Sequence, residues 1–303
     1  MSDLGIVVTE IATNAVRHGG GGELLVRALD EGRRGVEVLV VDRGRGMANV
    51  AECFRDGYST GGTMGTGLGA ARRRAHAFDI HSQPGGGTAV VARLWAGGAP
   101  EAGAGEIGAV CLPVAGESLS GDGWAAARAE RRSVIMVADG LGHGPSAADA
   151  AHLAVRIFRS NAARPAAEIM DLLHRGLKST RGAAAAVAEV DVQAGRLSYA
   201  GIGNISARIV TDGGARALVS HNGIVGHQAR RIQHFDYPWS DESTLVMHSD
   251  GITSHWKPEA WPGLMRRDPA LLAGLIHRDF VRGRDDSTVV AFRQGVHRLP
   301  AAR

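Results

Sequence analysis

Several features that would assign a chain quickly to a class are missing here. The 303 residues include only two cysteines, Cys53 and Cys111, whose number and spacing match neither a disulfide framework nor a zinc motif and indicate a reducing, cytoplasmic setting. No apolar run approaches the roughly 18 residues of a membrane-spanning helix, and no basic-then-apolar leader opens the chain. A net charge of only +3 does not indicate nucleic-acid binding. We therefore predict neither a membrane nor a nucleic-acid partner.

The sequence also lacks the common catalytic signatures. It has no G-x-S-x-G elbow, no H-E-x-x-H zinc motif and no Walker loop. Cys111 lies within an apolar stretch and is predicted to be a core residue rather than a nucleophile. Serine-elbow hydrolases, zinc proteases and cysteine enzymes are therefore not indicated.

Glycine, in contrast, is abundant, with 43 residues or twice the usual share of about 7 %. Some of it lies in a small-residue stretch that predicts a flexible linker over residues 97–105. The chain length fits two domains. We predict an N-terminal domain over 1–96, a second domain over 106–296 and a tail over 297–303.

Hydrophobic periodicity predicts an α+β protein in both parts. In the first part it predicts a helix from Ser2 or Asp3 to about residue 19, strands, a helix over 68–78 and a closing hairpin. In the second it predicts several strands and three helices, over 146–161, 166–179 and 269–280. Strands combined with two groups of helices favour a layered α+β domain.

Three clusters in the first domain could bind a nucleotide. Glu10, Asn14 and His18 are four residues apart and share one helix face, although a solvated polar stripe would read the same way. Asp42 follows an apolar strand and could accept a hydrogen bond from an exocyclic amine, and Gly44 and Gly46 follow it; an ordinary turn is the alternative.

The third cluster is a glycine-rich run that leads into a helix, where backbone amides form an anion site. Its glycines are Gly65, Gly67 and Gly69. The arginines that follow, at 72–74, could face phosphate, but a solvated helix face is the favoured interpretation.

Taken together, the segments TEIATNAVRHGGGGEL, VVDRGRGM and GTGLGAARRRAHAF resemble the GHKL ATPase fold, and most closely serine kinases of the RsbT and RsbW type. The resemblance covers nearly all of residues 3–95 and implies a GHKL (Bergerat) α/β sandwich that binds ATP and Mg²⁺. It implies that Asn14 holds Mg²⁺, that Glu10 is the general base and that Asp42 binds the adenine amine. It further implies nucleotide contacts for Gly44, Gly46, Gly65, Gly67, Gly69 and Thr88. Relatives carry a further strand and helix before the Glu–Asn helix, so we expect a domain that is truncated at its start.

The second domain carries acidic residues beside glycines at predicted strand ends. These are Asp139, Asp250 and the pair Asp285–Asp286, together with Asp122 in the glycine-bearing segment SGDG. Each alone reads as an ordinary turn, but four such sites could converge on one sheet edge as hard oxygen ligands for Mg²⁺ or Mn²⁺.

The motifs VADGLGHG, MHSDGITS and RDDSTVV resemble the SpoIIE branch of the metal-dependent Ser/Thr phosphatases, the PPM family, with closest likeness to the RsbX type. The resemblance spans about 106–294 and implies an α-β-β-α sandwich with two Mn²⁺ or Mg²⁺ ions. It implies that Asp139 bridges both ions and that the Gly140 carbonyl, Asp250, Asp285 and, less clearly, Asp122 complete the ligand set. Asp286 is expected to orient the loop, and His143 to make a structural hydrogen bond rather than to contact phosphate.

The sequence therefore predicts a switch that phosphorylates and dephosphorylates Ser or Thr on a STAS-domain regulator, in a partner-switching pathway or a stressosome-like complex. One alternative makes the first domain a non-catalytic, ATP-dependent module that binds the partner. Another makes it an ATP-sensing regulator of the phosphatase.

Overall fold

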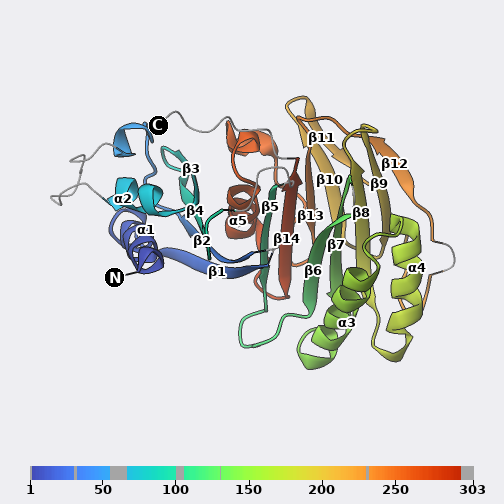
Figure 1. Cartoon of the computed structure of the whole chain (residues 1–303). Helices are drawn as coiled ribbons and strands as arrows, with labels where there is room; N and C mark the ends of the chain where they lie inside the picture. The colour runs from blue at the N-terminus through green and yellow to red at the C-terminus, as the bar shows by residue number, and fades with distance from the viewer. Residues whose placement is uncertain are drawn as a thin grey trace. The chain divides into compact units, whose positions relative to one another are not determined.

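The computed structural model describes residues 2–30, 33–54, 67–99, 106–129, 131–229 and 232–294. The chain forms two compact units, one made of Met1–Ala102 and Trp261–Arg278 and the other of Gly103–Ala260 and Asp279–Arg303. Both units combine helices with antiparallel sheets, so the α+β prediction is confirmed (Figure 1). None of the helices in the described ranges is long and apolar enough to cross a membrane.

The first unit opens with helix α1 (Asp3–Gly19), as the sequence predicts. The Ser2 side chain accepts a hydrogen bond from the Gly5 amide and caps the helix N-terminus. Gly20 ends the helix in the left-handed conformation, with φ of 68° and its amide bonded to the Ala15 carbonyl. One face of α1, including Val7 and Ile11, is buried.

A four-stranded antiparallel sheet forms the body of the first unit. In spatial order its strands are β1 (Gly22–Asp30), β2 (Arg34–Asp42), β4 (Gly87–Trp95) and β3 (Ala77–Gln83). Val38 and Val40 of β2 pack with α1 and with helix α2 (Gly67–Arg74) in one apolar cluster. The predicted helix over 68–78 is wrong at its end, because Ala77 and Phe78 already pair with β4 as the start of β3.

The opposite face of this sheet carries helix α5 (Pro269–Phe280), which comes from the last fifth of the sequence. A Cβ atom at Gly274 would lie 3.0 Å from side-chain carbons of Leu39 and Val41, so the helix backbone passes close to β2. Leu39 and Val41 alternate with Val38 and Val40 and therefore point away from α1. The sheet of the first unit thus has helices on both faces.

The second unit contains two five-stranded antiparallel sheets and the helices α3 (Pro145–Asn161) and α4 (Ala166–Gly176). In spatial order, one sheet comprises β12 (Phe235–Pro238), β9 (Arg196–Ile202), β8 (Ala183–Asp191), β7 (Arg132–Gly140) and β6 (Asp122–Ala129). The other comprises β11 (Gly214–Ala217), β10 (Ser206–Thr211), β13 (Thr244–His248), β14 (Ser287–Arg293) and β5 (Glu106–Leu112). Short 3-10 helices cover Glu52–Phe54, Leu177–Ser179, Pro258–Ala260 and Leu264–Arg266.

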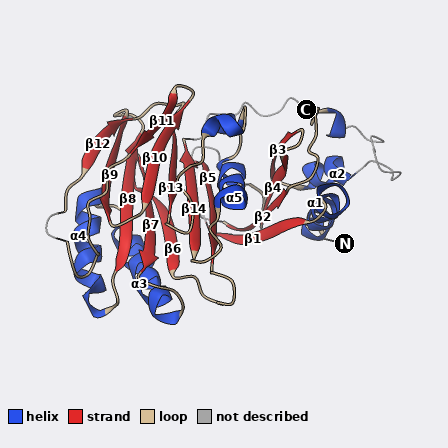
Figure 2. Ribbon diagram, turned by 180° about the vertical axis from the view of Figure 1, so that it is seen from behind, coloured by secondary structure: helices blue, strands red, loops and turns tan. Residues whose placement is uncertain are grey.

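Two apolar clusters hold these layers together, and α3 and α4 lie over the outer face of the first sheet (Figure 2). Alternate residues of β7 point to opposite sides: Val134 and Met136 pack against the helices, whereas Ile135 and Val137 pack between the two sheets. This two-sided burial explains why β7 reads as a continuous apolar run. Asp122 and Asp139 lie at the ends of β6 and β7, whereas Asp250 and the pair Asp285–Asp286 lie in loops after β13 and before β14.

Candidate nucleotide and metal sites

Helix α1 presents Glu10 and Asn14 to the beginning of α2. A Cβ atom at Gly67, the first residue of α2, would lie 2.6 Å from Glu10 Oε2 and 3.7 Å from Asn14 Nδ2. Both side chains are half-buried, whereas His18, one turn further on, is exposed. The structure therefore brings the predicted base, the predicted magnesium ligand and the glycine-rich helix start together. Only a glycine fits at position 67 without displacing the Glu10 carboxylate.

Asp42, at the end of β2, is buried and tied to the opposite strand. Its Oδ1 atom accepts hydrogen bonds from the amides of Gly44 at 2.9 Å and Thr88 at 3.1 Å. Burial raises the pKa of Asp42, and these two hydrogen bonds oppose the shift. Within the described residues, no hydrogen bond reaches the other carboxylate oxygen, Oδ2, which can therefore accept one from an exocyclic amine.

Gly44 and Gly46 are needed by the protein itself. A Cβ atom at Gly44 would lie 2.4 Å from the His18 carbonyl oxygen, and one at Gly46 would lie 1.9 Å from the Gln83 carbonyl oxygen. Gly46 also has a φ of 66°, in the left-handed region that favours glycine. Contact of these glycines with a base stays a prediction, because close packing within the unit already accounts for both.

The structure describes two of the three remaining predicted residues of this site, Thr88 and Gly69. Thr88 shares a 2.9 Å hydroxyl–hydroxyl hydrogen bond with Ser82, which also accepts from the Met47 amide at 2.9 Å. Gly69 is buried inside α2. Gly65 lies outside the described residues.

Two of the arginines in the last turn of α2 engage the protein itself. Arg72 lies over the Phe54 ring at 4.9 Å, and Arg74 forms an exposed 2.6 Å ion pair with Asp3. These contacts support the interpretation of a solvated helix face.

In the second unit, two acidic residues meet across neighbouring strands. Asp122 begins β6 and is the cross-strand partner of Asp139 near the end of β7. Asp122 is 3 % exposed, and its Oδ2 accepts a 2.6 Å hydrogen bond from the Ser249 hydroxyl, which in turn accepts from the Thr288 amide. The sequence pattern placed Asp122 in a glycine turn and missed strand β6, so this pairing comes from the structure alone.

Loops after β13 and before β14 supply the other carboxylates. Asp250 lies two residues after the end of β13, and its Oδ2 accepts a 2.7 Å hydrogen bond from Asn204. Asp286 accepts hydrogen bonds from the amides of Val114 and Gly121, both at 2.8 Å, and so fastens the approach to β6. These two contacts support the expectation that Asp286 orients a loop. Asp285 Oδ1 accepts a 2.9 Å hydrogen bond from the Asp286 amide.

Electrostatics show that these carboxylates act on one another. Burial raises the pKa of Asp139 well above its usual range, and the negative charges of Asp122 and Asp250 add to the shift. Burial likewise raises the pKa of Asp122, although its hydrogen bond from Ser249 opposes the shift. Burial and the charge of Asp285 raise the pKa of Asp250. The acidic cluster is therefore a site where a positive charge would be stabilised.

In the described part of the chain, no three His, Cys, Asp or Glu side chains stand close enough to form a finished metal site. The carboxylates of the acidic cluster nevertheless fit a divalent cation, because carboxylate oxygens are the ligands that Mg²⁺ and Mn²⁺ prefer. A bound cation would also offset the cost of burying these charges and their mutual repulsion. The assignment of individual ligands stays a prediction. It concerns Asp122, Asp139, Gly140, Asp250 and Asp285.

Neighbouring residues define what else this site contains. A Cβ atom at Gly140 would lie 2.2 Å from the Ala147 carbonyl oxygen, so the start of α3 requires glycine there. His143 Nδ1 lies 3.1 Å from Glu117 Oε1, in agreement with a structural role. Burial raises the pKa of the Cys111 thiol to about 11, which keeps it protonated and unreactive.

Three residues near the acidic site escaped the sequence analysis. Asn204 follows the glycines of YAGIGNI, and Ser249 directly precedes Asp250. Their positions next to these motifs are the sequence feature that could have identified them. Arg181 is exposed, and a Cβ atom at Gly142 would lie 3.3 Å from its Nη1 atom. Arg181 therefore places a positive charge at the loop that follows Asp139, and nothing in its sequence context predicts this.

Comparison with known families assigns both parts of the chain. Residues 129–294 match the model for stage II sporulation protein E (SpoIIE), and residues 2–97 match the model for the histidine kinase-, DNA gyrase B- and HSP90-like ATPases. These matches confirm the predicted GHKL domain followed by a SpoIIE-type PPM phosphatase domain.

Individual relatives agree with this assignment. The serine/threonine-protein kinase RsbT of Bacillus subtilis is 30 % identical over 89 residues, which are 29 % of this chain and 67 % of RsbT. The phosphoserine phosphatase RsbX of the same organism is 20 % identical over 138 residues, 45 % of this chain and 69 % of RsbX. A chain from the solved structure "The bacterial stressosome: a modular system that has been adapted to control secondary messenger signaling" is 32 % identical, with a TM-score of 0.59 over 62 % of this chain and 99 % of that one.

Proposed function

We propose that this chain, which belongs to the SpoIIE phosphatase family and carries a GHKL-type ATPase domain before its phosphatase domain, is a bifunctional switch acting on Ser or Thr of a STAS-domain regulator. Homology to a kinase and to a phosphatase of partner-switching systems supports a signalling role. The single observation that carries the kinase half is the convergence of Glu10 and Asn14 on Gly67. In this proposal the functional domains are 1–96 and 106–296.

For the kinase half, the residues of the first unit have distinct roles. Asp42 would accept a hydrogen bond from the adenine amine through Oδ2 while the Gly44 and Thr88 amides hold its other oxygen in place. Glu10 would accept the proton of the substrate hydroxyl, and Asn14 would hold Mg²⁺ beside the α2 N-terminus. Bound Mg²⁺ would neutralise charge that develops on the phosphates. Phosphoryl transfer depends mainly on such positioning, which suits side chains fixed on one helix.

For the phosphatase half, Asp139 and Asp250 with Asp122 and Asp285 would hold two divalent cations, Mg²⁺ or Mn²⁺, together with the Gly140 carbonyl. When bound, such ions polarise a phosphate ester and lower the pKa of water. Ser249 holds Asp122 in position, and Asn204 holds Asp250. These hydrogen bonds would keep the carboxylates oriented.

The proposed setting is the cytoplasm, with ATP and Mg²⁺ at the first site and a STAS-domain phosphoprotein, alone or in a stressosome-like complex, as the shared substrate. Two opposed activities on one chain would meet the same partner at high local concentration. No nucleic acid is involved in this scheme.

The test uses the full chain, γ-labelled ATP and a STAS-domain protein encoded beside it. Asp139→Asn should accumulate labelled STAS protein because removal of phosphate stops, while Glu10→Gln should yield no label. A complete lack of label in Asp139→Asn, with nucleotide bound, would refute the kinase half. If Glu10→Gln preserves regulation of the partner and Asn14→Ala abolishes it, the first domain is a binding module instead. Release of phosphate from phosphoserine peptides, dependent on Mn²⁺ and absent in Asp139→Asn, tests the phosphatase half.

A further inference from the structure

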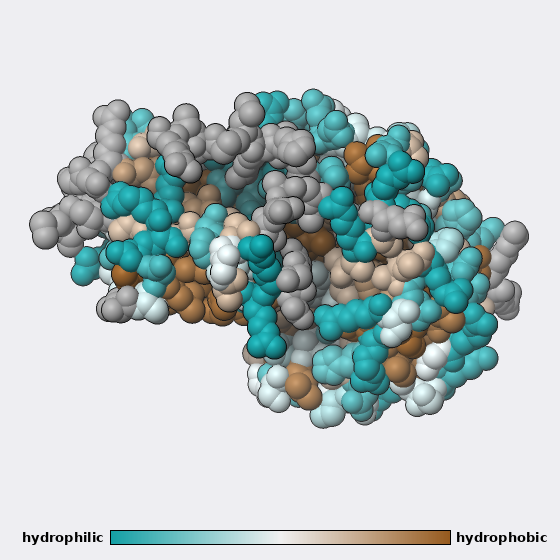
Figure 3. All heavy atoms as spheres, in the orientation of Figure 1, coloured by the Kyte–Doolittle hydropathy of each residue, from teal (hydrophilic) through white to brown (hydrophobic). Residues whose placement is uncertain are grey.

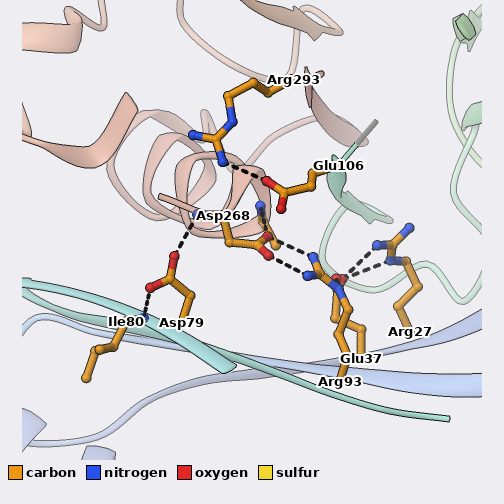
Figure 4. A network of polar contacts seen from close by, with 9 residues as sticks. Arg27, Glu37, Asp79, Ile80, Arg93, Glu106, Asp268 and Arg293 are labelled. Atoms are coloured by element: carbon orange, nitrogen blue, oxygen red, sulfur yellow. Dashed lines mark hydrogen bonds and ion pairs between the residues drawn. The ribbon is translucent and has the colours of Figure 1, made fainter. Parts of the chain in front are cut away.

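The first unit is completed by a segment that the phosphatase part of the sequence encodes. Trp261–Arg278 belongs to this unit, and Asp268 anchors it at the N-terminus of α5. The Asp268 carboxylate forms a bidentate ion pair with Arg93 of β4, in which Arg93 Nη2 lies 2.8 Å from Asp268 Oδ1 (Figure 4). The Asp268 amide donates a 2.8 Å hydrogen bond to Asp79 Oδ2 of β3. Arg93 is itself paired with Glu37, so the anchor is part of a buried network on the sheet.

The other end of the segment is fastened to the candidate adenine site. Arg278 Nη1 donates a 2.5 Å hydrogen bond to the main-chain carbonyl of Asp42. In the opposite direction, Arg43 donates through Nη2 to the carbonyl of Arg278. Arg278 is 7 % exposed and Asp42 is 8 % exposed, so this reciprocal pair of hydrogen bonds lies in the interior. Residues 236 positions apart are thereby joined at the residue predicted to recognise adenine.

A glycine at position 87 leaves space for this pair of hydrogen bonds. A Cβ atom at Gly87 would lie 2.1 Å from the Asp42 carbonyl oxygen and 2.7 Å from Arg278 Nη1. Gly87 has a φ of 77° and directly precedes Thr88, whose amide binds the Asp42 carboxylate. The Asp42 carbonyl faces Arg278 while its carboxylate faces the Thr88 amide. Arg278 therefore helps to determine how Asp42 is presented to a nucleotide.

The same segment is bonded at both ends to the loops of the acidic site. Ten residues separate Asp250 from Trp261, and six separate Arg278 from Asp285. We propose that Arg278 is a positioning residue for Asp42 and that, through the 261–278 segment, nucleotide binding at Asp42 restrains the two loops that carry Asp250 and Asp285. This inference rests on the proposed function, because it takes both sites as real.

Coupling of this kind is a thermodynamic linkage. Nucleotide favours the arrangement in which Arg278 holds Asp42 by some coupling free energy. A substitution that abolishes this arrangement must then weaken nucleotide binding by that same coupling free energy. A charge-assisted hydrogen bond lost at a buried carbonyl corresponds to about a tenfold change in affinity. Nucleotide would then act on the phosphatase part as a regulator as well as a kinase substrate.

The experiment is hydrogen–deuterium exchange on the full chain at fixed Mg²⁺, with and without ADP, together with fluorescence titration of N-methylanthraniloyl-ADP. In the wild type, ADP should slow exchange in peptides over 36–47 and 80–92, in 261–278, and in the flanking loops 249–260 and 279–286. Arg278→Met should bind the fluorescent ADP about tenfold more weakly. At saturating ADP it should keep protection at 36–47 and lose it in the flanking loops.

Two further variants keep the result interpretable. Arg43→Met removes the reciprocal hydrogen bond and leaves Arg278 in place, and it replaces Arg278→Met if circular dichroism shows that the latter is unfolded. Arg34→Met removes an exposed arginine of the same unit and should match the wild type in every measurement.

The outcomes separate the two hypotheses. Protection confined to 36–47 and 80–92 in the wild type would overturn the coupling and leave the nucleotide site standing. Loss of all protection, with no binding of the fluorescent ADP, would refute the nucleotide site and the coupling with it. Protection of the flanking loops that persists in both Arg278→Met and Arg43→Met would overturn the role of Arg278.

Discussion

Replacement of Asp268 by alanine is the most informative test of how the first unit is built. The change removes one of the two carboxylates that pair with buried Arg93 in the described part of the chain and leaves Glu37. Breaking a buried ion pair by removing one partner costs about 3–5 kcal/mol. Asp268 also accepts a 3.0 Å hydrogen bond from the Ala270 amide as a cap of α5, and losing a cap costs about 1 kcal/mol.

The expected loss of stability is therefore about 4–6 kcal/mol, which for a unit of this size lowers the melting temperature by roughly 15–25 °C. Calorimetry of the full chain measures this, and hydrogen exchange shows whether 261–278 is the segment released. Asp268→Asn keeps the side-chain volume and an acceptor for the Ala270 amide, so it should fall between the alanine variant and the wild type.

Asp3→Ala serves as the control, because it removes an exposed ion pair with Arg74 that is worth at most about 1 kcal/mol. If Asp268→Ala lowers the melting temperature no more than Asp3→Ala does, and exchange in 261–278 is unchanged, then the segment is not anchored through Asp268 and the reasoning is refuted.

Three further predictions concern the second unit. Without divalent cations, Asp139→Asn should raise the unfolding free energy at pH 8, because burial disfavours the ionised Asp139 side chain of the folded wild type. Wild-type stability should accordingly increase as pH falls from 8 to 6.5, and urea titrations with and without Mn²⁺ check this. Burial lowers the pKa of His248 to about 4, so the neutral side chain contributes fully to stability above pH 6.5 and this contribution is lost as the pH falls toward 4. The loss is about 3 kcal/mol, and it should be absent from His248→Gln in urea melts at the two pH values. Arg181→Met should raise the KM for phosphoserine peptides severalfold with little change in kcat, because Arg181 lies at the loop after Asp139 as a cation for incoming phosphate; an unchanged KM would contradict this.

The surface of the first unit also carries an apolar area. Val16, at the end of α1, is 68 % exposed, and Val26 of β1 is 61 % exposed. Figure 3 shows apolar surface gathered over α1 and β1. Val26 is the cross-strand partner of Val38, so its side chain points to the same face of the sheet as α1. On that face α1 packs over residues of β2 and β4. This apolar area therefore lies where α1 does not extend over β1.

Local patterns determined much of this protein. Hydrophobic spacing predicted a helix from Ser2 or Asp3 to about residue 19, and the structure has α1 there with Ser2 as its cap. Short motifs carried the resemblance to two families, and both family assignments are confirmed. These features depend on neighbouring residues along the chain, which is why the sequence alone was sufficient.

Only the tertiary structure decided where α5 lies and what it holds. Its residues from 269 to 278 are all buried, so the sequence indicates a buried helix but not which sheet covers it. The bonds Arg93–Asp268 and Arg278–Asp42 join positions 175 and 236 residues apart, and no periodicity encodes such a pairing. Strand β6 was missed for the same reason: its small residues carry a weak pattern, and pairing with β7 is what orders them. Local spacing specifies elements and motifs, whereas contacts distant in sequence depend on the shape of the folded chain.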